Sequence, residues 1–403
     1  MALLSVEEAL SRVLDGVEPL APENVPIAEA AGRVLATDLT ALRSQPPAAV
    51  SAMDGYAVRA ADVVGGRAEL KIIGEVAAGR PFPGNVGPGD AARIFTGGVV
   101  PPGADAVIVQ EQTERDGDVV VIAGSAQPGK NIRREALDFA RGDVLLRRGR
   151  LLSARDIALA AAMNHAQIPV HRRPKVAILA TGDELVPPGT KLEPGQIVSA
   201  NGLTLVAFAS AEGAEARDFG IAPDRIGPTV EALQRMRSWG ADVLVTTGGA
   251  SVGEHDLVQR ALTAEGMALA FWKVAVRPGR PMMHGRIGST RVLGLPGNPV
   301  SAFVCACLFL TPLLRRLTGR SDLSPPTESA VLGRELPAND ERRDYLRAKL
   351  ERRPDGSWVA VPFALQDSSM LSPLAQADCL IMREPYARAA AAGSRCAIVK
   401  LGL

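Results

Sequence analysis

Glycines and carboxylates gather in one segment, Asp242–Asp256, which reads DVLVTTGGASVGEHD. The apolar run at its start is typical of a buried parallel strand, and the glycines that follow let backbone amides approach a ligand. Such amides suit an anion, whereas the carboxylates of Glu254 and Asp256 suit a metal ion or a hydroxyl-bearing ligand. The segment therefore predicts a site for a phosphate ester that is handled together with a divalent cation. Alternatively, the two acids only cap the helix that begins here.

A second cluster, ATGDEL, follows another apolar run. Thr181 and Gly182 form a turn, and Glu184 begins the next segment. Acids at this place also complement a helix dipole without binding anything. In a parallel sheet, however, Glu184, Asp224 and Asp256 follow separate strands, and converging carboxylates favour Mg²⁺. The pattern predicts a magnesium site above the sheet.

Two further clusters are a cationic turn and a proline-flanked helix start. KVAVRPGRP places Lys273, Arg277 and Arg280 at a strand end, and a cationic turn stiffened by proline and glycine suits an oxyanion. LGLPGNPVS places Asn298 to cap a helix, with free amides and the Ser301 hydroxyl facing the space above the sheet. Solvated surface charge and a purely structural cap are the alternatives.

The length and composition are typical of a globular protein with several domains, each with its own hydrophobic core. The chain has 403 residues, 47% of them hydrophobic, and a formal net charge of +1, which gives no reason to expect a nucleic-acid or membrane surface. Met1–Val17 is typical of an amphipathic helix with a capping box at Ser5 and Glu8, not of a signal peptide. The longest apolar run, Val300–Leu314, is too short to span a bilayer. We therefore expect a soluble, cytoplasmic protein.

Hydrophobic periodicity divides the first half of the chain into a scaffold and an insertion. Helical patterns predict a discontinuous helical scaffold at residues 1–44 and 141–172. Short β-rich runs between glycine and proline turns predict a small β domain inserted at residues 45–140. The helical patterns lie at Val6–Val17, Ile27–Leu39 and Ser153–Ala166.

The second half alternates between strands and helices. Residues 173–320 predict an α/β domain whose parallel sheet is covered by helices on both faces, so that ligands bind outside the carboxyl ends of the strands. A Ser/Pro-rich linker then leads to a β-rich unit at residues 321–403. The expected strands of the α/β domain are Val176–Leu179, Ala214–Phe219, Val243–Val245 and Leu269–Val274.

Eight motifs follow one another along nearly the whole chain: SAMDGYAV, RIFTGGVVPPGADAVI, NIRR, RPKVAILATGDEL, TTGGASVGEHD, KVAVRPGRP, GLPGNPVSAF and QDSSMLSPLAQADCLI. Together they closely resemble the molybdopterin molybdenumtransferase family, which includes the bacterial MoeA proteins and the E domains of proteins such as gephyrin. The resemblance implies an elongated helical domain, an inserted β domain, an α/β domain with a mainly parallel, MogA-like sheet, and a C-terminal β-barrel-like domain.

The resemblance also implies an activity. The family inserts molybdenum from molybdate into adenylylated molybdopterin and releases AMP, assisted by Mg²⁺ or another divalent cation. It implies a homodimer in which each active site combines the α/β domain of one protomer with the inserted β domain of the other, and a molybdopterin adenylyltransferase as the protein that supplies the substrate. Two alternatives stay open: the chain is itself such an adenylyltransferase, or it is a non-catalytic scaffold that binds the cofactor.

Positions matching the family's functional residues fall into four groups. The catalytic positions are Asp54, Thr96, Glu184, Asp256 and Lys273. The substrate-binding positions are Thr181, Gly182, Thr247, Gly248, Gly249, Ser251, Gly253, Pro296, Asn298 and Arg133. The molybdate-binding positions are Arg277, Arg280, Ser301, Arg343 and Ser368. The metal ligands are Glu184, Asp224 and Asp256.

The chain departs from the family pattern at three places. Arg280 replaces the usual lysine of RPGKP, which keeps the charge but changes its shape. NIRRxGED becomes NIRREALD, so that Ala136 stands at a glycine position, which is strained if the backbone φ is positive, and Leu137 replaces an acid. Ala250 replaces a valine.

Overall fold

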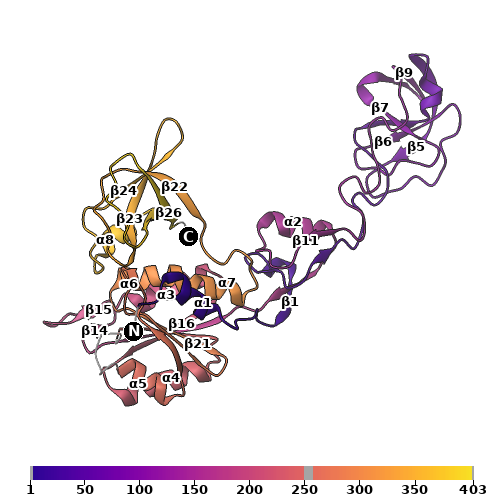
Figure 1. Ribbon diagram of the computed structural model, residues 1–403. Helices are drawn as coiled ribbons and strands as arrows, with labels where there is room; N and C mark the ends of the chain where they lie inside the picture. The colour runs from indigo at the N-terminus through magenta and orange to yellow at the C-terminus, as the bar shows by residue number, and fades with distance from the viewer. Residues whose placement is uncertain (1–2, 249–256, 402–403) are drawn as a thin grey trace.

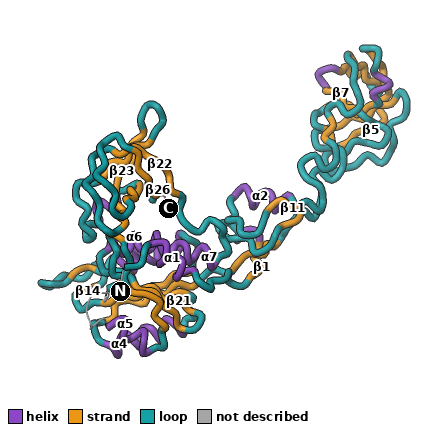
Figure 2. The backbone as a smooth tube through the Cα atoms, in the orientation of Figure 1, coloured by secondary structure: helices purple, strands orange, loops and turns teal. Residues whose placement is uncertain are grey.

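The computed structural model describes residues 3–248 and 257–401. Figure 1 shows that these residues form an elongated molecule. An α/β unit and a C-terminal β unit lie side by side at one end, and a second β unit lies at the far end of a narrow arm. Helices gather around the α/β unit, whereas the far unit consists mainly of strands and loops (Figure 2).

A six-stranded mixed sheet forms the centre of the α/β unit, in the order β16-β13-β17-β21-β20-β18. The first four strands are parallel, which confirms the mainly parallel sheet, and the last two run antiparallel to their neighbours. Leu269–Val274, expected as a further strand of a parallel sheet, therefore forms an antiparallel edge instead. The strands are β13 (Lys175–Thr181), β16 (Glu215–Ala222), β17 (Val243–Thr247), β18 (Ala268–Trp272), β20 (Met283–Ile287) and β21 (Thr290–Leu295).

Helices cover both faces of this sheet, as predicted. One face buries apolar side chains of α4 and α5, and the other buries those of α3, α6 and α7. Because both faces are covered, all five residues of β17 are buried, which explains its unbroken apolar run. The helices are α3 (Asn201–Ala211), α4 (Ile226–Ser238), α5 (Leu257–Ala264), α6 (Pro299–Cys305) and α7 (Thr311–Leu317).

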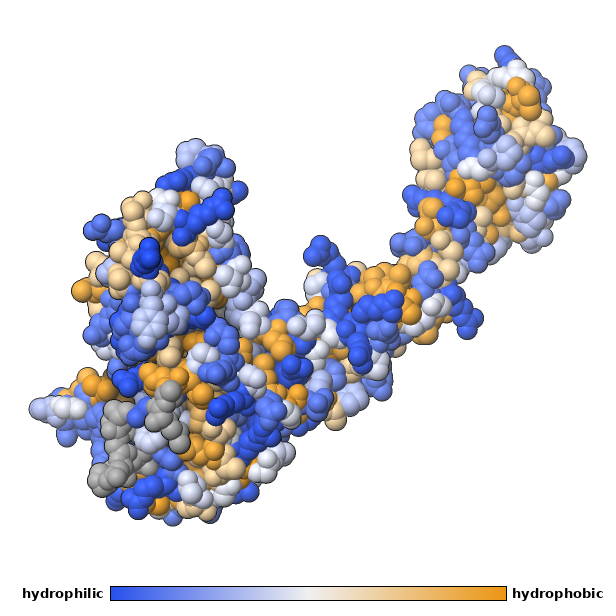
Figure 3. All heavy atoms as spheres, in the orientation of Figure 1, coloured by the Kyte–Doolittle hydropathy of each residue, from blue (hydrophilic) through white to orange (hydrophobic). Residues whose placement is uncertain are grey.

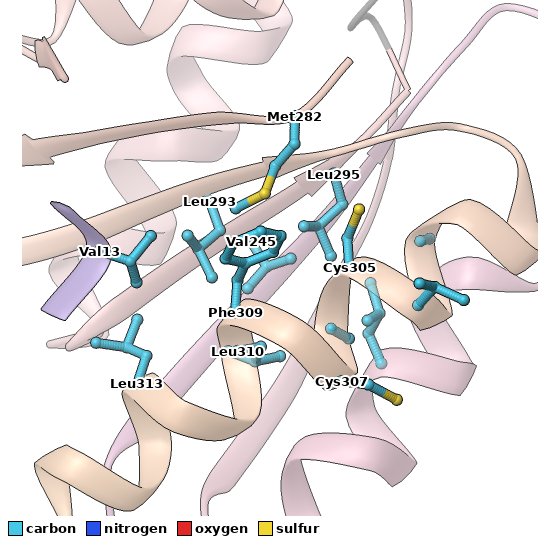
Figure 4. Close-up of a cluster of buried hydrophobic side chains, with 14 of the residues drawn as sticks. Val13, Val245, Met282, Leu293, Leu295, Cys305, Cys307, Phe309, Leu310 and Leu313 are labelled. Carbon is cyan, nitrogen blue, oxygen red and sulfur yellow. The ribbon is translucent and has the colours of Figure 1, made fainter. Parts of the chain in front are cut away.

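The N-terminal helix α1 (Val6–Leu14) contributes to the core of the α/β unit. Figure 4 shows Val13 beside Phe309 and Leu313, which come from the helical run near the end of that unit. The predicted capping box is present, because the Glu8 amide donates to Ser5 Oγ at 3.1 Å and the Ser5 amide donates to Glu8 Oε2 at 3.0 Å. The helix therefore fastens the start of the chain to the α/β unit.

One helix, Pro299–Leu317, is long and apolar enough to cross a membrane by length and composition. It is continuous because a π-helical turn, η4 (Ala306–Leu310), joins α6 to α7. The helix is therefore longer than the apolar run Val300–Leu314, and the prediction that this run is too short to span a bilayer is wrong for the helix as a whole. Within the protein, 78% of its most apolar window is buried, and Cys305 and Phe309 are fully buried. This helix serves as a core helix of the α/β unit.

The arm contains little helix. Ile27–Leu39, predicted as a helix, holds only the 3-10 turn η1 (Ile27–Glu29). The amides of Leu35 and Ala36 donate to carbonyls of Arg150 and Pro169 rather than within a helix, so the prediction is wrong. Its apolar residues instead pack into a small core of the arm, which residues 25–41 and 139–170 build together. The other elements are β1 (Pro22–Pro26) paired with β12 (Gln167–His171), β2 (Leu39–Thr40) paired with β11 (Val144–Leu146), and α2 (Ala154–Ala162).

The far β unit is a six-stranded sheet in the order β7-β4-β6-β5-β9-β8, with two hydrophobic clusters of its own. The chain enters through β3 (Val50–Ser51) and leaves through β10 (Ile132–Arg133), which pair with each other. This is the inserted β fold that the resemblance implied. Its elements are β4 (Gly55–Val58), η2 (Ala60–Val63), β5 (Arg67–Val76), β6 (Asp90–Ile94), β7 (Ala106–Val109), η3 (Gln110–Gln112), β8 (Thr113–Asp116) and β9 (Val119–Ala123).

The C-terminal unit is a closed barrel of five strands. Strands β23-β24-β22-β26-β25 form the sheet, and a β23–β25 pairing closes it. The short strand β19 (Val276–Arg277) also pairs with β23, so the cationic turn lies between the barrel and the α/β unit. The barrel elements are β22 (Thr327–Leu332), β23 (Arg343–Arg352), β24 (Trp358–Pro362), α8 (Leu371–Ala375), β25 (Cys379–Arg383) and β26 (Arg395–Lys400).

Candidate active site

A cavity of about 710 Å³ lies at the carboxyl ends of β13, β17 and β21. This edge is where open α/β sheets bind their ligands. The predicted site residues that line it come from four segments that are far apart in the sequence. These residues are Thr181, Gly182, Glu184, Asp224, Thr247, Gly248, Pro296, Asn298 and Ser301.

The cavity also has an apolar wall that the sequence motifs did not indicate. β14 (Leu185–Val186) and β15 (Ile197–Val198) form a short parallel pair, and Ile197 lines the cavity although its side chain is 54% exposed. Leu371, from the barrel, lines it too. Apolar walls around a few polar groups are the usual composition of a small-molecule site. Only the hydrophobicity of these residues marks them in the sequence.

Close packing between two strand ends explains the glycine of the TTGG turn. Gly248 has a φ of +88°, and a Cβ added there would lie 2.2 Å from the carbonyl oxygen of Thr181. A Cβ on Gly297 would lie 3.4 Å from the Gly248 Cα, and the carbonyl of Gly297 accepts a hydrogen bond from Asn201 Nδ2 at 2.7 Å. The floor of the cavity is therefore made of closely packed backbone from three turns.

Acidic side chains gather along one side of the cavity. Partial burial, together with the charges of Asp183 and Glu184, raises the pKa of Asp224 above its usual value. The Asp224 amide donates to Asp183 Oδ1 at 3.1 Å, and the Glu184 carboxylate fills the space beside Gly182. Within residues 3–248 and 257–401, no three acidic, histidine or cysteine side chains come close enough to hold a metal ion by themselves. A cation here would need a further ligand.

The barrel completes the cavity near the start of α6. Ser369 lines the cavity, and its neighbour Ser368 accepts a hydrogen bond from Asn298 Nδ2 at 2.8 Å. The carbonyl of Ser368 accepts the Val300 amide at 3.0 Å. The expectation that the side chain of Asn298 caps α6 is therefore wrong, and the Val300 amide, expected to be free, is not, because the barrel segment bonds to both groups.

The cationic turn lies beside the cavity rather than in it. Lys273 has a φ of 89°, unusual for a residue with a side chain, and its ammonium lies 5.4 Å from the centre of the Trp272 ring. Arg277 pairs with the barrel carboxylates of Asp340 and Asp344. Arg280 is exposed, and its guanidinium has no hydrogen bond or ion pair within the part of the chain that the structure describes. Lys273 is likewise in no ion pair within the described residues, so a ligand can reach Arg280 or Lys273, but not Arg277, without breaking one.

Arg343 is also engaged elsewhere. Its guanidinium pairs with Glu7 of α1 and Glu384 of the barrel, which raises its pKa against the opposing effect of burial. Arg347, four residues later, was not predicted, yet it reaches the segment that carries Ser368. Strand alternation puts both arginines on the same face of β23, so the sequence could have indicated Arg347 by this spacing.

The structure places Asp54, Thr96 and Arg133 in or beside the far β unit. Asp54 immediately precedes β4, and Figure 1 shows the sheet of that unit at the opposite end of the arm from the α/β unit, whose strand ends line the cavity. Asp54 Oδ1 accepts the amide and the hydroxyl of Thr96, each at 2.7 Å, and these bonds lower the pKa of Asp54. Nearby, Ala136 has a φ of 55°, so it adopts the strained conformation expected at a glycine position. Within a single chain, Asp54 therefore lies far from the cavity.

Part of the predicted site lies outside the described residues. Gly249, Ser251, Gly253 and Asp256 belong to this group, as do Glu254 and Ala250.

Fold and cavity together define an elongated α/β protein whose ligand pocket lies at the carboxyl ends of parallel strands, between that sheet and a β-barrel. Family comparisons agree in detail. Residues 4–164 match the MoeA N-terminal region (domain I and II), residues 177–316 match a probable molybdopterin binding domain, and residues 329–401 match the MoeA C-terminal region (domain IV).

Individual relatives extend over most of the chain. A molybdopterin molybdenumtransferase of Haemophilus influenzae is 34% identical over 385 residues, 95% of each chain. Molybdopterin molybdenumtransferase 2 of Mycobacterium tuberculosis is 36% identical over 87% of this chain and 88% of its own. A crystal structure of a molybdopterin biosynthesis MoeA protein from Pyrococcus horikoshii covers 100% of both chains, with 31% identity and a TM-score of 0.88. The chain therefore belongs to the molybdopterin molybdenumtransferase family.

Proposed function

We propose that this protein is an enzyme of molybdenum cofactor biosynthesis that inserts molybdenum from molybdate into adenylylated molybdopterin and releases AMP. The observation that carries the proposal is the cavity at the ends of β13, β17 and β21, which gathers residues of the motifs ATGDEL, TTGG and GLPGNPVS with a barrel segment. The names of relatives at 34–36% identity support it.

The chemistry requires cleavage of a phosphoanhydride, so negative charge on the phosphate oxygens must be neutralised. We assign Mg²⁺, or another divalent cation, to Glu184 and Asp224, with Asp256 as the third ligand. The raised pKa of Asp224 supports this assignment, because partial burial and the charges of Asp183 and Glu184 both disfavour its carboxylate until a cation neutralises it. When bound, the cation supplies charge neutralisation at the phosphate, and the glycine turns supply backbone amides.

Molybdate is a tetrahedral dianion and is a substrate of the proposed reaction. Among its predicted ligands, Ser301 lines the cavity and the guanidinium of Arg280 is unpaired in the described structure. We therefore assign its binding first to Arg280, Ser301 and Ser368, and we expect Arg277 and Arg343 to join only if they leave their carboxylate partners. Lys273 is assigned to a substrate phosphate as a point charge.

A homodimer supplies the residues that the cavity lacks. Asp54 is prepared for a role in the reaction, because Thr96 holds it as a carboxylate, but it lies far from the cavity of its own chain. Apolar side chains that are exposed on the arm, including Leu42 and Leu151, support an interface there. Figure 3 shows hydrophobic residues gathered on the visible face of the arm. We propose that Asp54, Thr96 and Arg133 reach the cavity of a second copy, in the cytoplasm, and that a molybdopterin adenylyltransferase supplies the substrate.

The test is AMP release from adenylylated molybdopterin in the presence of molybdate and Mg²⁺. Molybdate-dependent release is expected. ATP-dependent adenylylation of metal-free molybdopterin would instead identify an adenylyltransferase, and tight substrate binding without any AMP release would identify a scaffold. Either result would overturn the proposal.

A further inference from the structure

Arg347 is the largest of the fully buried side chains, with 1% exposure, and it takes part in no ion pair within the described residues. A buried charge without a counter-ion costs free energy unless its donors are fully bonded. Burial lowers its pKa accordingly, against the small opposing effect of Asp367. Such a residue calls for a structural or functional reason.

Its guanidinium is bonded to a single short segment of the barrel. Nη1 donates to the carbonyl of Met370 at 2.8 Å, and Nη2 donates to the carbonyls of Asp367 at 2.9 Å and Leu365 at 3.3 Å. Gln366 closes the arrangement, because its Oε1 accepts the Arg347 amide at 3.0 Å and its Nε2 donates to the Arg347 carbonyl at 2.9 Å. We call Arg347 and Gln366 the clamp, and residues 365–371 the clamped segment.

The clamped segment is the part of the barrel that reaches the cavity. Ser368 contacts Asn298 through its hydroxyl and Val300 through its carbonyl, and Ser369 and Leu371 line the cavity. No side chain of β23 itself lines the cavity. The clamp therefore connects the barrel strand to the cavity through this segment alone.

The clamp also sets the direction of the backbone. In a trans peptide, the carbonyl and the amide hydrogen of the same unit point in opposite directions. Because the carbonyls of Leu365 and Asp367 point at the guanidinium, the amides of Gln366 and Ser368 point away from it. Neither amide has an acceptor within the described part of the chain. Unpaired amides of this kind are donors for an oxyanion.

We propose that Arg347 is a positioning residue: with Gln366 it holds residues 365–371 so that Ser368 and its backbone can engage the tetrahedral oxyanion substrate. A neutral residue of equal length would fill the space but leave the carbonyls of Leu365 and Met370 without donors. A lysine would keep the charge but lose the planar fork that bonds several carbonyls at once. The kinetic part of this proposal rests on the proposed function, because the probe is molybdate.

The test compares Arg347→Lys and the milder Gln366→Met with the wild-type full-length protein. The matched control is Arg352→Lys, on the same strand, whose guanidinium stacks over Trp358 at 5.8 Å and lies outside the clamp. We expect Arg347→Lys to raise KM for molybdate about tenfold with kcat almost unchanged, since one or two lost hydrogen bonds account for a change of that size. Gln366→Met should raise it a few-fold, and the control should not change it.

A double-mutant cycle separates positioning from general stability. If Arg347 acts through Ser368, the effects of Arg347→Lys and Ser368→Ala on KM are not multiplicative, because the second change removes what the first one positions. Multiplicative effects, or an unchanged KM in Arg347→Lys, would overturn the proposal.

Hydrogen exchange at the amides of Ser369 and Met370 tests the clamp without any activity. These amides bond to Asp367 within the segment, so Arg347→Lys should speed their exchange while the melting temperature stays near that of the control. Unchanged exchange would overturn the clamp itself. Failure of the wild type to release AMP with molybdate would contradict only the proposed function, and the exchange result would still decide whether the clamp exists.

Discussion

At the scale of single residues, Asp54 and Asp224, two of the acids assigned to the reaction, are held in opposite electrostatic conditions. Two hydrogen bonds from Thr96 lower the pKa of Asp54, whereas burial and neighbouring acids raise the pKa of Asp224. Asp54 is therefore a stable carboxylate without a metal, and Asp224 becomes one more easily when a cation is near. The difference agrees with a positioning role for the first and a metal-binding role for the second.

Replacing Thr96 by valine removes the hydroxyl that donates to Asp54 Oδ1 and keeps the backbone bond. Because the lost bond favours the charged form, the pKa of Asp54 rises toward its usual value. The acid limb of the pH profile of kcat/KM for AMP release should move to higher pH. NMR titration of the Asp54 carboxyl carbon measures the same shift directly. Thr113→Val, whose hydroxyl bonds to the carbonyl of Gln110 in the same unit, is the control and should leave both unchanged.

Asp224 links stability to pH and to Mg²⁺. A carboxyl with a raised folded-state pKa stabilises the fold at low pH, and that contribution is lost as the pH rises through the folded-state pKa. Added Mg²⁺ should therefore raise the melting temperature more at neutral pH than in acid, since a ligand at 100 times its Kd stabilises by about 2.7 kcal/mol.

Asp224→Asn should remove this dependence and raise the Mg²⁺ concentration needed for AMP release at least tenfold. Asp218→Asn, at a carboxylate that does not line the cavity, is the matched control. Equal Mg²⁺ responses in both variants would argue against the metal assignment.

At the scale of elements, the turns above the sheet depend on backbone packing. Gly248 and Gly240 share nearly the same φ, +88° and +81°, but a Cβ meets the Thr181 carbonyl only at Gly248. Gly240→Ala should cost about 1–2 kcal/mol of unfolding free energy, from the conformation alone. Gly248→Ala should cost more and should also weaken substrate binding, because the ends of β13 and β17 must move apart. Denaturant unfolding and substrate titration measure the two effects, and equal costs would show that the close contact is unimportant.

The physical basis of sequence prediction differs between the elements. The core strands were predictable because burial on both faces leaves an unbroken apolar run, as in Val243–Val245 of β17. Ile27–Leu39 was not, because its apolar residues follow no single element and pack against a returning pass of the chain.

The site residues divide in the same way. Thr181, Glu184 and Thr247 follow strands, and the carboxyl ends of parallel strands meet, so their proximity could be predicted. The spacing on one face of β23 could have indicated Arg347 beside Arg343. Only the tertiary structure shows which of the two bonds to the segment that carries Ser368. The apolar wall formed by Ile197 has no motif at all.

At the scale of the whole molecule, the distance between the far β unit and the cavity allows a direct test of shared sites. At a Mg²⁺ concentration that just saturates the wild type, Asp54→Asn and Asp224→Asn should each release almost no AMP alone. In an equal mixture that exchanges subunits, half of the dimers carry one intact site, so about a quarter of wild-type activity should return. The control mixture combines Asp224→Asn with Glu184→Gln, which disable the same half of the site and should restore nothing. No recovery in the first mixture would mean that each site is built from one chain.

The paired entrance and exit of the far β unit have a consequence for how the chain can be rearranged. Gln45 and Phe139 bridge each other, as do β3 and β10, so the two ends of the intervening segment lie side by side. A short loop could join the arm where that unit is removed, and the excised piece keeps both of its own hydrophobic clusters. The far β unit is therefore an insertion that could be replaced by another small domain on the same arm, without changing the fold of the arm or of the α/β unit.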